Sequence, residues 1–360
     1  MTKPWEENIR KVVPYVPGEQ PKGERLIKLN TNENPYPPAP NVAAALEQME
    51  IEKLRRYPDP TASDLVCALA QYYGLEKDQV FVGVGSDDVL GMAFLTYFHS
   101  RKPILFPDIT YSFYPVWANL FGIPYKTRKL DDNFYIRPED YFEDNGGVIF
   151  PNPNAPTGLY LPLEQVEEIL KHNQSSVVIV DEAYIDFGGV SARTLLDRYE
   201  NLLVVQTFSK SRSMAGVRIG YAFGSPELLK AMENVKYSYN SYTMNLPSIV
   251  LGVEALKNRD YFTRTIDKIV KTRERAKDRF RTLGFHCLDS SANFLFMTHE
   301  KKDAKQILEA LRSNQIYVRH FDGPRLSDYL RVTIGTDEEM ETVYEFLASY
   351  LRLNNEFGSW

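Results

Sequence analysis

Residues 176–184 read SVVIVDEAY, and this stretch decides the fold class. Residues 177–180 are apolar at every position, which is typical of a strand in a parallel sheet that is covered on both faces. Asp181 and Glu182 follow directly, where such a strand would end. Because ligands of open α/β sheets bind at the carboxyl ends of the strands, we expect Asp181 to hold a metal or a cationic nitrogen. The alternative is that Asp181 only caps the next turn.

Similar segments recur on both sides of this strand and alternate with amphipathic stretches of helical length. Further strands are expected at residues 79–85, 102–106, 146–150, 201–208 and 217–224, and helices from residue 86 and at residues 111–121 and 163–172. This alternation is the pattern of βαβ units. It predicts an α/β protein with a large, mostly parallel sheet of at least six strands.

The pattern changes after about residue 245. One long charged stretch, residues 261–283, carries a loose apolar stripe and is expected to be a helix. A smaller α/β unit is expected beyond it, with strands at residues 293–297, 316–321 and 329–335 and helices at 304–312 and 338–351. A helix at residues 42–50 is expected to pack with this unit. We predict a large domain of residues 50–260 and a small domain of residues 1–49 and 261–360.

The composition limits the classes of function. The 360 residues carry a net charge of −6, with 43% apolar and 25% charged residues, as in ordinary globular proteins. Without a long basic run, a nucleic-acid partner is not expected, and no stretch approaches the roughly 20 apolar residues needed to span a membrane. Cys67 and Cys287 form neither a disulfide framework nor a metal-binding pair, and the five histidines lack ligand spacing. We expect a cytoplasmic protein with small-molecule partners and no metal.

Residues 207–218, TFSKSRSMAGVR, place three cations among small and hydroxyl side chains between two expected strands. A lysine in a partly desolvated, cation-rich site favours its neutral amine, and a neutral amine is what Schiff-base chemistry needs. Lys210 is therefore a candidate for covalent catalysis. The alternative is a basic turn in contact with solvent.

Two more loops follow expected strands. Residues 83–88, GVGSDD, combine glycines with the start of a helix, whose free N–H groups can bind an anion. A dinucleotide-binding fingerprint is excluded because Asp88 stands where that motif needs glycine; the alternative is a plain helix start with Ser86 as its N-cap. Residues 151–158, PNPNAPTG, form either a rigid loop that can hold an asparagine amide or a simple turn.

Together these four segments predict a particular cofactor. An anion cradle, a buried carboxylate, an asparagine loop and an activated lysine match the phosphate, the pyridine nitrogen, the ring hydroxyl and the aldehyde of pyridoxal 5′-phosphate. Such a set is far more specific than any one of its members. We therefore expect a pyridoxal-phosphate protein.

The sequence also resembles a known family over nearly its whole length. The motifs LNTNENPYPP, PNPNAPTG, DEAY, TFSKSRSMAGVRIGY and YLRVTIGT occur in the order and at the spacing found in fold-type I pyridoxal-phosphate-dependent aminotransferases, and within them in the histidinol-phosphate aminotransferases. The resemblance implies a seven-stranded, mostly parallel sheet flanked by helices, plus a smaller α/β domain. It also implies transfer of an amino group between L-histidinol phosphate and 2-oxoglutarate, a step of histidine biosynthesis.

The resemblance implies a role for each cofactor-binding residue. Lys210 would be the Schiff-base lysine and proton shuttle, Asp181 would pair with the pyridine nitrogen, and Tyr184 would bond the ring hydroxyl. Tyr111 would stack on the ring. The other implied cofactor contacts come from Asn154, Ser209, Arg218 and the backbone N–H groups of Ser86 and Asp87.

The resemblance further implies a homodimer with shared active sites, because Tyr57 is similar to a tyrosine that reaches the cofactor phosphate of the neighbouring subunit. Arg331 resembles the arginine that clamps the α-carboxylate of the amino-acid substrate, a task suited to its planar fork. Arg319, Tyr15 and Asn32 resemble residues around the substrate side chain or phosphate.

Two departures from the family pattern bear on the cofactor. Ala155 stands where the family usually has asparagine, so the amide contact to the ring hydroxyl must come from Asn154 or be lost, and Val84 stands between the glycines where asparagine is frequent. Three other functions stay open: an aromatic amino-acid aminotransferase, a threonine-phosphate decarboxylase and a non-catalytic pyridoxal-phosphate-binding protein. His320 and the tyrosines of residues 237–242 are weaker candidates for the walls of the site.

Overall fold

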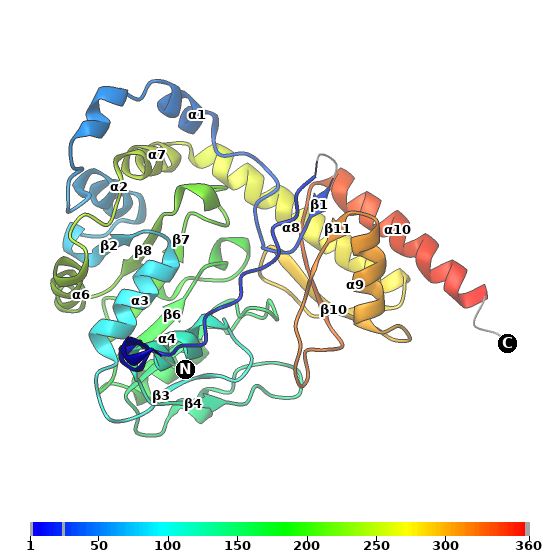
Figure 1. The fold of residues 1–360 in the computed structure, drawn as a ribbon, viewed down its shortest axis with the longest axis horizontal. Helices are drawn as coiled ribbons and strands as arrows, with labels where there is room; N and C mark the ends of the chain where they lie inside the picture. The colour runs from blue at the N-terminus through cyan, green and yellow to red at the C-terminus, as the bar shows by residue number, and fades with distance from the viewer. Residues whose placement is uncertain (1–2, 24–25, 357–360) are drawn as a thin grey trace.

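The computed structural model describes residues 3–23 and 26–356. Among these, seven strands form one large sheet in the order β2-β8-β7-β6-β5-β3-β4, in which β8 runs antiparallel to both neighbours and every other pair is parallel (Figure 1). The predicted large, mostly parallel sheet is therefore confirmed. Its strands are β2 (Val80–Gly83), β3 (Ile104–Pro107), β4 (Tyr125–Arg128), β5 (Gly147–Pro151), β6 (Val178–Asp181), β7 (Leu202–Thr207) and β8 (Gly220–Phe223).

The central strand β6 is buried on both faces. Val178 and Val180 belong to one apolar cluster, whereas Ile179 belongs to another, because successive side chains of a strand point to opposite faces. All three are 0% exposed. Within the described large sheet, β4 is the strand that the sequence pattern missed. It pairs only with β3 at the sheet edge and is mostly exposed, so it needs no apolar run.

Helices cover both faces of this sheet. The two apolar clusters place α2, α5 and α7 over one face and α3, α4 and α6 over the other. Burial on both sides is what an all-apolar strand such as β6 requires. The bounds are α2 (Ser63–Tyr73), α3 (Ser86–Tyr97), α4 (Phe113–Phe121), α5 (Leu163–His172), α6 (Pro226–Tyr239) and α7 (Leu246–Lys257).

A second unit follows the long helix α8 (Arg259–Thr282). Its antiparallel sheet has the order β12-β13-β10-β9, and a short parallel pair joins β1 to β11. The expected strand at residues 316–321 is divided between these two sheets. The bounds are β1 (Ile27–Lys28), β9 (Phe285–Cys287), β10 (Phe294–His299), α9 (Ala304–Ser313), β11 (Ile316–Tyr317), β12 (Arg319–His320), β13 (Leu330–Thr333) and α10 (Asp337–Glu356).

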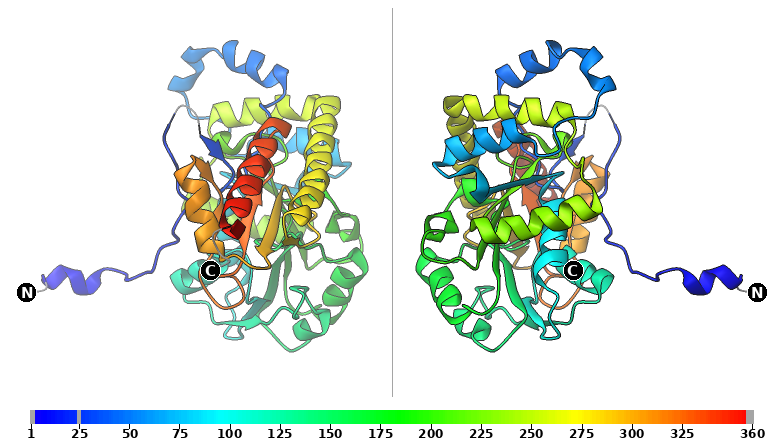
Figure 2. Two further views of the ribbon diagram at one scale, coloured as in Figure 1. Left: turned by 90° about the vertical axis from the view of Figure 1, so that its right-hand side faces the viewer. Right: turned by 90° about the vertical axis from the view of Figure 1, so that its left-hand side faces the viewer.

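The N-terminal segment links the two units. The short helix Pro4–Asn8 projects from the body of the molecule (Figure 2), whereas α1 (Pro40–Glu47) packs on α7 and buries Val42 in the core of the large sheet. The expectation that this helix packs with the C-terminal unit is wrong, because its apolar side chain meets α7. The domain division at residues 50 and 260 stays a prediction.

Short 3-10 helices complete the chain at Pro4–Asn8, Ile51–Arg55, Lys77–Gln79, Pro138–Tyr141, Ile185–Phe187, Ala192–Leu195 and Ala215–Val217. In the part of the chain that the structure describes, no helix combines the length and the apolar character needed to span a bilayer.

The start of α3 lies directly against β8. Gly85, at the helix N-cap, has φ of +85°, and a Cβ added to Gly220 would come within 2.2 Å of the Gly85 carbonyl carbon and 2.3 Å of the Ser86 nitrogen. Only glycine at position 220 leaves room for this backbone contact. The close approach fixes the N-terminus of α3 at the end of the sheet.

We predict that Gly220→Ala lowers the stability of the protein by about 1–3 kcal/mol, because the new methyl group must push α3 off the sheet. Thermal unfolding would measure the loss. Gly216→Ala is the matched control, since an added Cβ there meets no atom within 4 Å. Equal unfolding midpoints for the two variants would contradict the prediction.

Candidate active site

One pocket lies where the large sheet, the N-terminal segment and the small sheet meet. It brings together most of the residues that the sequence marked for the substrate and the cofactor ring. Its lining includes Tyr15, Asn32, Tyr111, Tyr184, Lys210, Arg319 and Arg331. These side chains come from segments up to 316 positions apart in the chain, counting from residue 15 to residue 331.

Lys210 follows strand β7 and reaches into this pocket. Its Nζ donates a hydrogen bond of 2.9 Å to the backbone oxygen of Thr31 and lies 5.9 Å from the centre of the Tyr184 ring. The side chain is only partly exposed and lines the pocket, which favours a role in the pocket over a basic turn in contact with solvent. The hydrogen bond to Thr31 therefore holds the primary amine of Lys210 inside the pocket.

Asp181 is the last residue of β6 and is 4% exposed. Its Oδ2 accepts a hydrogen bond of 2.9 Å from the Tyr114 hydroxyl, and the Ala183 N–H donates to Oδ1 over 3.3 Å. Burial raises the pKa of Asp181 to about 6, although both bonds oppose that rise. Such a carboxylate gains strongly from a cation placed beside it.

Tyr114 is a residue that the sequence reasoning missed. It is fully buried, and burial together with the Asp181 carboxylate holds its pKa well above 10, so it remains a hydrogen-bond donor. The signal was available, because Tyr114 lies one helical turn after Tyr111 in the same aromatic segment. Only the first of the two tyrosines had been singled out.

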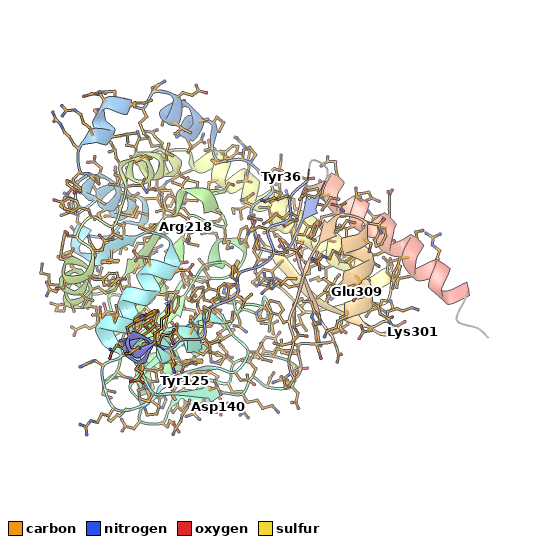
Figure 3. The ribbon with its side chains drawn as sticks, viewed as in Figure 1. Tyr36, Tyr125, Asp140, Arg218, Lys301 and Glu309 are labelled. Atoms are coloured by element: carbon orange, nitrogen blue, oxygen red, sulfur yellow. The ribbon has the colours of Figure 1, made fainter. Side chains whose placement is uncertain are left out.

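An anion cradle forms at the start of α3. Arg218, labelled in Figure 3, approaches the hydroxyl oxygen of Ser209 through Nη1 at 3.4 Å and Asp87 Oδ2 through Nη2 at 3.7 Å. A Cβ on Gly85 would meet this guanidinium at 2.4 Å. Gly85 is the N-cap of α3 and Ser86 is its first helical residue, so the interpretation of Ser86 as the N-cap is wrong. The backbone N–H groups of Ser86 and Asp87 open the helix, where an anion is favoured.

Tyr111 connects the cradle to the carboxylate. Its hydroxyl donates to Asp87 Oδ1 over 2.8 Å, and its ring meets the Tyr114 ring edge-on at 5.8 Å. Burial, followed by the charge of Asp87, raises the pKa of Tyr111, so the hydroxyl stays protonated. The ring lines the pocket, where a flat ligand can lie against it.

Two arginines face the same pocket from the small sheet. Arg331 donates through Nη2 to the Asn30 carbonyl over 2.9 Å, while its buried Nε lacks a partner among the described residues. Burial lowers the pKa of Arg331, and the charge of Arg319 adds to that effect. No carboxylate of the described chain is paired with either guanidinium, so the pocket favours an anionic ligand.

Asn154 does not line this pocket. Its Nδ2 donates to the Ile109 carbonyl at 3.0 Å and to the Thr157 hydroxyl at 3.1 Å, whereas Ala155 lines the pocket with a methyl group. Its buried Oδ1 lacks a partner among the described residues. The contact of Asn154 with a ring hydroxyl stays a prediction.

Tyr57, His320 and the tyrosines of residues 237–242 also lie apart from the pocket. Tyr57 is 82% exposed and stacks on Tyr242 at 4.6 Å. His320 faces a neighbouring pocket, and its Nε2 contacts the Ser327 carbonyl at 2.8 Å. Within one described chain, neither the Tyr57 side chain nor the tyrosines of residues 237–242 line the site.

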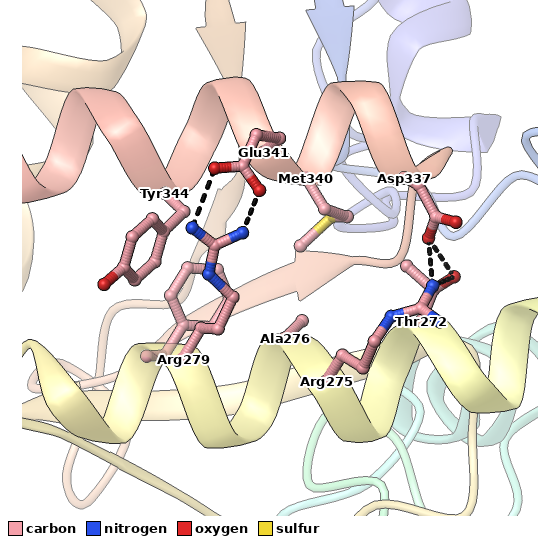
Figure 4. A pocket seen from close by; sticks show the side chains of 9 residues that line it. Thr272, Arg275, Ala276, Arg279, Asp337, Met340, Glu341 and Tyr344 are labelled. Atoms are coloured by element: carbon pink, nitrogen blue, oxygen red, sulfur yellow. Dashed lines mark hydrogen bonds and ion pairs between the residues drawn. The ribbon is translucent and has the colours of Figure 1, made fainter.

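A different pocket lies between α8 and α10 (Figure 4). Its arginines already have carboxylate partners, with Arg279 bound to Glu341 and Arg275 to Asp337. A new anion would have to displace these carboxylates. Among the described residues no cluster of histidine, cysteine and acidic side chains suits a metal ion. The pocket around Lys210 is therefore the candidate active site.

This fold and this pocket define an aminotransferase. The family "Aminotransferase class I and II" matches residues 24–347. A solved histidinol-phosphate aminotransferase from Sinorhizobium meliloti, in complex with pyridoxal-5′-phosphate, superimposes with a TM-score of 0.83 at 25% identity, covering 91% of each chain.

Curated relatives narrow the group. A histidinol-phosphate aminotransferase from Lactococcus lactis subsp. lactis is 49% identical over 99% of both chains. Histidinol-phosphate aminotransferase 1 from Methylococcus capsulatus is 52% identical over 96% of both. The chain belongs to the histidinol-phosphate aminotransferases of the class I and II aminotransferase family.

The buried carboxylate yields a test on the protein without cofactor. The pKa of Asp181 is raised in the folded state, so the unfolded chain ionises first, and stability falls as the pH rises from about 4 to 6. We predict that Asp181→Asn abolishes this loss, which amounts to about 3 kcal/mol. Thermal unfolding of both proteins between pH 4 and 8 would measure it.

Glu182→Gln is the matched control for this test. Burial raises the pKa of Glu182 to about 7, so its own loss should continue to a higher pH than that of Asp181. A difference between wild type and Asp181→Asn that does not change with pH would show that the Asp181 carboxylate is not held in this way.

Proposed function

We propose that this enzyme transfers an amino group between L-histidinol phosphate and 2-oxoglutarate, as a step of histidine biosynthesis, with pyridoxal 5′-phosphate as its cofactor. One observation carries the proposal. The amine of Lys210 and the guanidinium groups of Arg319 and Arg331 face one pocket. The buried carboxylate of Asp181 is bonded to Tyr114, whose ring contacts Tyr111 in the wall of that pocket. The near-full-length similarity to histidinol-phosphate aminotransferases supports the same reaction.

The residues present fit the cofactor. Among the described residues the buried carboxylate of Asp181 has no cationic partner, so it can pair with a protonated ring nitrogen. At Gly85 the Arg218 guanidinium lies so close to the backbone that a side chain would not fit. Tyr111 offers a ring face and Tyr184 a hydroxyl. The phosphate would be held by the N–H groups of Ser86 and Asp87 with Ser209 and Arg218. When bound, the cofactor supplies an electron sink for the carbanion left by loss of the substrate's α-proton.

Lys210 serves as the attachment point and as the base and acid. Its Nζ donates to the backbone oxygen of Thr31. A primary amine held in the pocket in this way can take a proton from the substrate and return it at Nζ.

The two arginines suit the charges of the two substrates. Glutamate carries an α-carboxylate, which the planar fork of Arg331 can bind through two parallel bonds. Arg319 offers a second cation for the phosphate of histidinol phosphate, with Tyr15 beside it. This second cation favours a phosphorylated substrate over an aromatic amino acid. A substrate role for Asn32 stays a prediction, because its amide already bonds Tyr184.

The experiment that tests the function is an amino-transfer assay with 2-oxoglutarate as acceptor and histidinol phosphate, phenylalanine or threonine phosphate as donor. We expect a clear preference for histidinol phosphate and no turnover by Lys210→Ala. Arg319→Met should lower kcat/KM for histidinol phosphate by about 10- to 100-fold, since a charge-assisted bond is lost. It should leave phenylalanine nearly unaffected. A preference of the wild type for phenylalanine would contradict the assignment.

The proposal includes a homodimer with shared sites. Tyr57 is 82% exposed, and several apolar side chains of the N-terminal region are exposed as well, among them Val13 at 87% and Ile51 at 78%. A partner that covers such exposed apolar side chains would remove them from water. A second copy of the chain would cover them and bring its Tyr57 to the phosphate cradle.

The proposal also places the enzyme in the cytoplasm. Both cysteines are free thiols, as is usual for proteins of that reducing compartment.

Mixing two inactive variants tests the shared site. Tyr57→Ala and Lys210→Ala subunits are unfolded, refolded together and assayed with histidinol phosphate. A mixed dimer contains one site with both native residues, so about a quarter of the wild-type activity should return at equal amounts. Activity that does not exceed the sum of the separate variants would exclude a shared site. Each variant refolded alone is the control.

A further inference from the structure

We propose that Thr333 is a positioning residue that sets the direction of the hydrogen bonds at Tyr184 and so keeps the Tyr184 hydroxyl proton free for the cofactor ring oxygen. The inference rests on the proposed function, because it concerns the same site. It assigns a task to a side chain that does not line the pocket.

The hydroxyl of Thr333 has two bonds, both to Asn32. It accepts from the Asn32 backbone N–H at 3.0 Å and donates to Asn32 Oδ1 at 3.0 Å. A hydroxyl has only one proton. Because the backbone N–H can only donate, the Thr333 proton must point to Oδ1.

This bond decides which way the Asn32 amide is turned. With Oδ1 directed at Thr333, Nδ2 faces Tyr184 and donates to its hydroxyl oxygen over 2.9 Å. Tyr184 therefore accepts from Asn32, and its own proton remains available for another acceptor. Thr333 and Asn32 are 2% and 1% exposed, so water has little access to this chain of bonds.

The backbone that carries Asn32 is held from several sides. Thr333 donates its N–H to the Leu29 carbonyl at 3.0 Å, Arg331 bonds the Asn30 carbonyl, and Asn293 Nδ2 donates to the Asn32 carbonyl at 3.0 Å. Asn32 itself has φ of +58°, a conformation that asparagine tolerates better than most residues. These bonds fix the backbone of Asn32 and therefore the position of its side-chain amide.

This sequence has a specific need for such a device. Ala155 places a methyl group in the pocket, and the amide nitrogen of Asn154 is engaged with Ile109 and Thr157. The donation to the ring oxygen then depends on Tyr184. The charged groups that face Tyr184 are Lys210 and Arg331, and neither replaces a directed donor at that position.

The test replaces Thr333 by valine, which has nearly the same shape without the hydroxyl, and by serine, which keeps the hydroxyl. In Thr333→Val, Asn32 Oδ1 loses its donor, so the amide can turn and accept the proton of Tyr184. We expect kcat to fall about tenfold and the pH at which the absorption spectrum of the cofactor-loaded protein changes to move upward, because donation favours the anionic ring oxygen. Thr333→Ser should restore both.

A double-variant cycle with Tyr184→Phe separates positioning from general damage. If Thr333 acts through Tyr184, Thr333→Val has no further effect on kcat or on the spectral midpoint in the Tyr184→Phe background. Equal effects in both backgrounds, or failure of serine to restore the spectrum, would overturn the proposal. Unfolding midpoints of the unloaded variants show that each is folded.

The outcome also distinguishes this inference from the proposed function. If the wild type forms a coloured complex with pyridoxal 5′-phosphate, transfers amino groups and responds to Tyr184→Phe but not to Thr333→Val, only the role of Thr333 is wrong. If the wild type neither binds the cofactor nor turns over any donor, both proposals fail together.

Discussion

The burial of one carboxylate, that of Asp181, is the constraint on which the site depends. Strand β6 carries it to the end of a sheet that is covered by helices on both faces, where the charge has little solvation. Its two hydrogen bonds, from Tyr114 and from the backbone of Ala183, leave the pKa raised to about 6. When ionised, such a buried carboxylate destabilises the folded protein unless a cation lies beside it. A protonated pyridine nitrogen is such a cation.

The cations of the chain divide into two kinds. Arg319 and Arg331 face the pocket with no carboxylate partner in the described part of the chain, which leaves them available to anionic substrates. Arg212 follows Lys210 by only two positions, yet it does not face the pocket. It is buried among the rings of Tyr72, Phe208 and Phe262. Its charge stabilises packing through cation–π contacts. Proximity in sequence therefore did not decide which cation serves the ligand.

The sheet and its loops were predictable from the sequence because a parallel sheet imposes strong local requirements. An all-apolar run such as residues 177–180 has to be buried on both faces, and the carboxyl ends of neighbouring parallel strands share one edge. Strand β4 lacked such a run because it lies at the exposed edge. The helix α1 was assigned to the wrong unit, since an amphipathic pattern shows that a face is buried but not against what.

The parts of the site that escaped prediction are those made by backbone atoms and by distant partners. Lys210 bonds the carbonyl of Thr31, and a carbonyl has no signature in the sequence. The pairing of Thr333 with Asn32 joins residues 301 positions apart. A single sequence therefore predicts the side chains that face the pocket, but not the residues that orient them.

The segment of residues 29–32 explains why these distant contacts matter together. On the small-sheet side it accepts one bond from Arg331, two from Thr333 and one from Asn293, and it donates the Asn32 N–H to the Thr333 hydroxyl. On the other side it offers Thr31 O to Lys210 and the Asn32 amide to Tyr184. The amine of Lys210, the hydroxyl of Tyr184 and the guanidinium of Arg331 are therefore all bonded to the same short segment. Because hydrogen bonds of this kind are directional, a shift of that segment would misalign all three groups at once, which favours a rigid attachment here over one on a mobile loop.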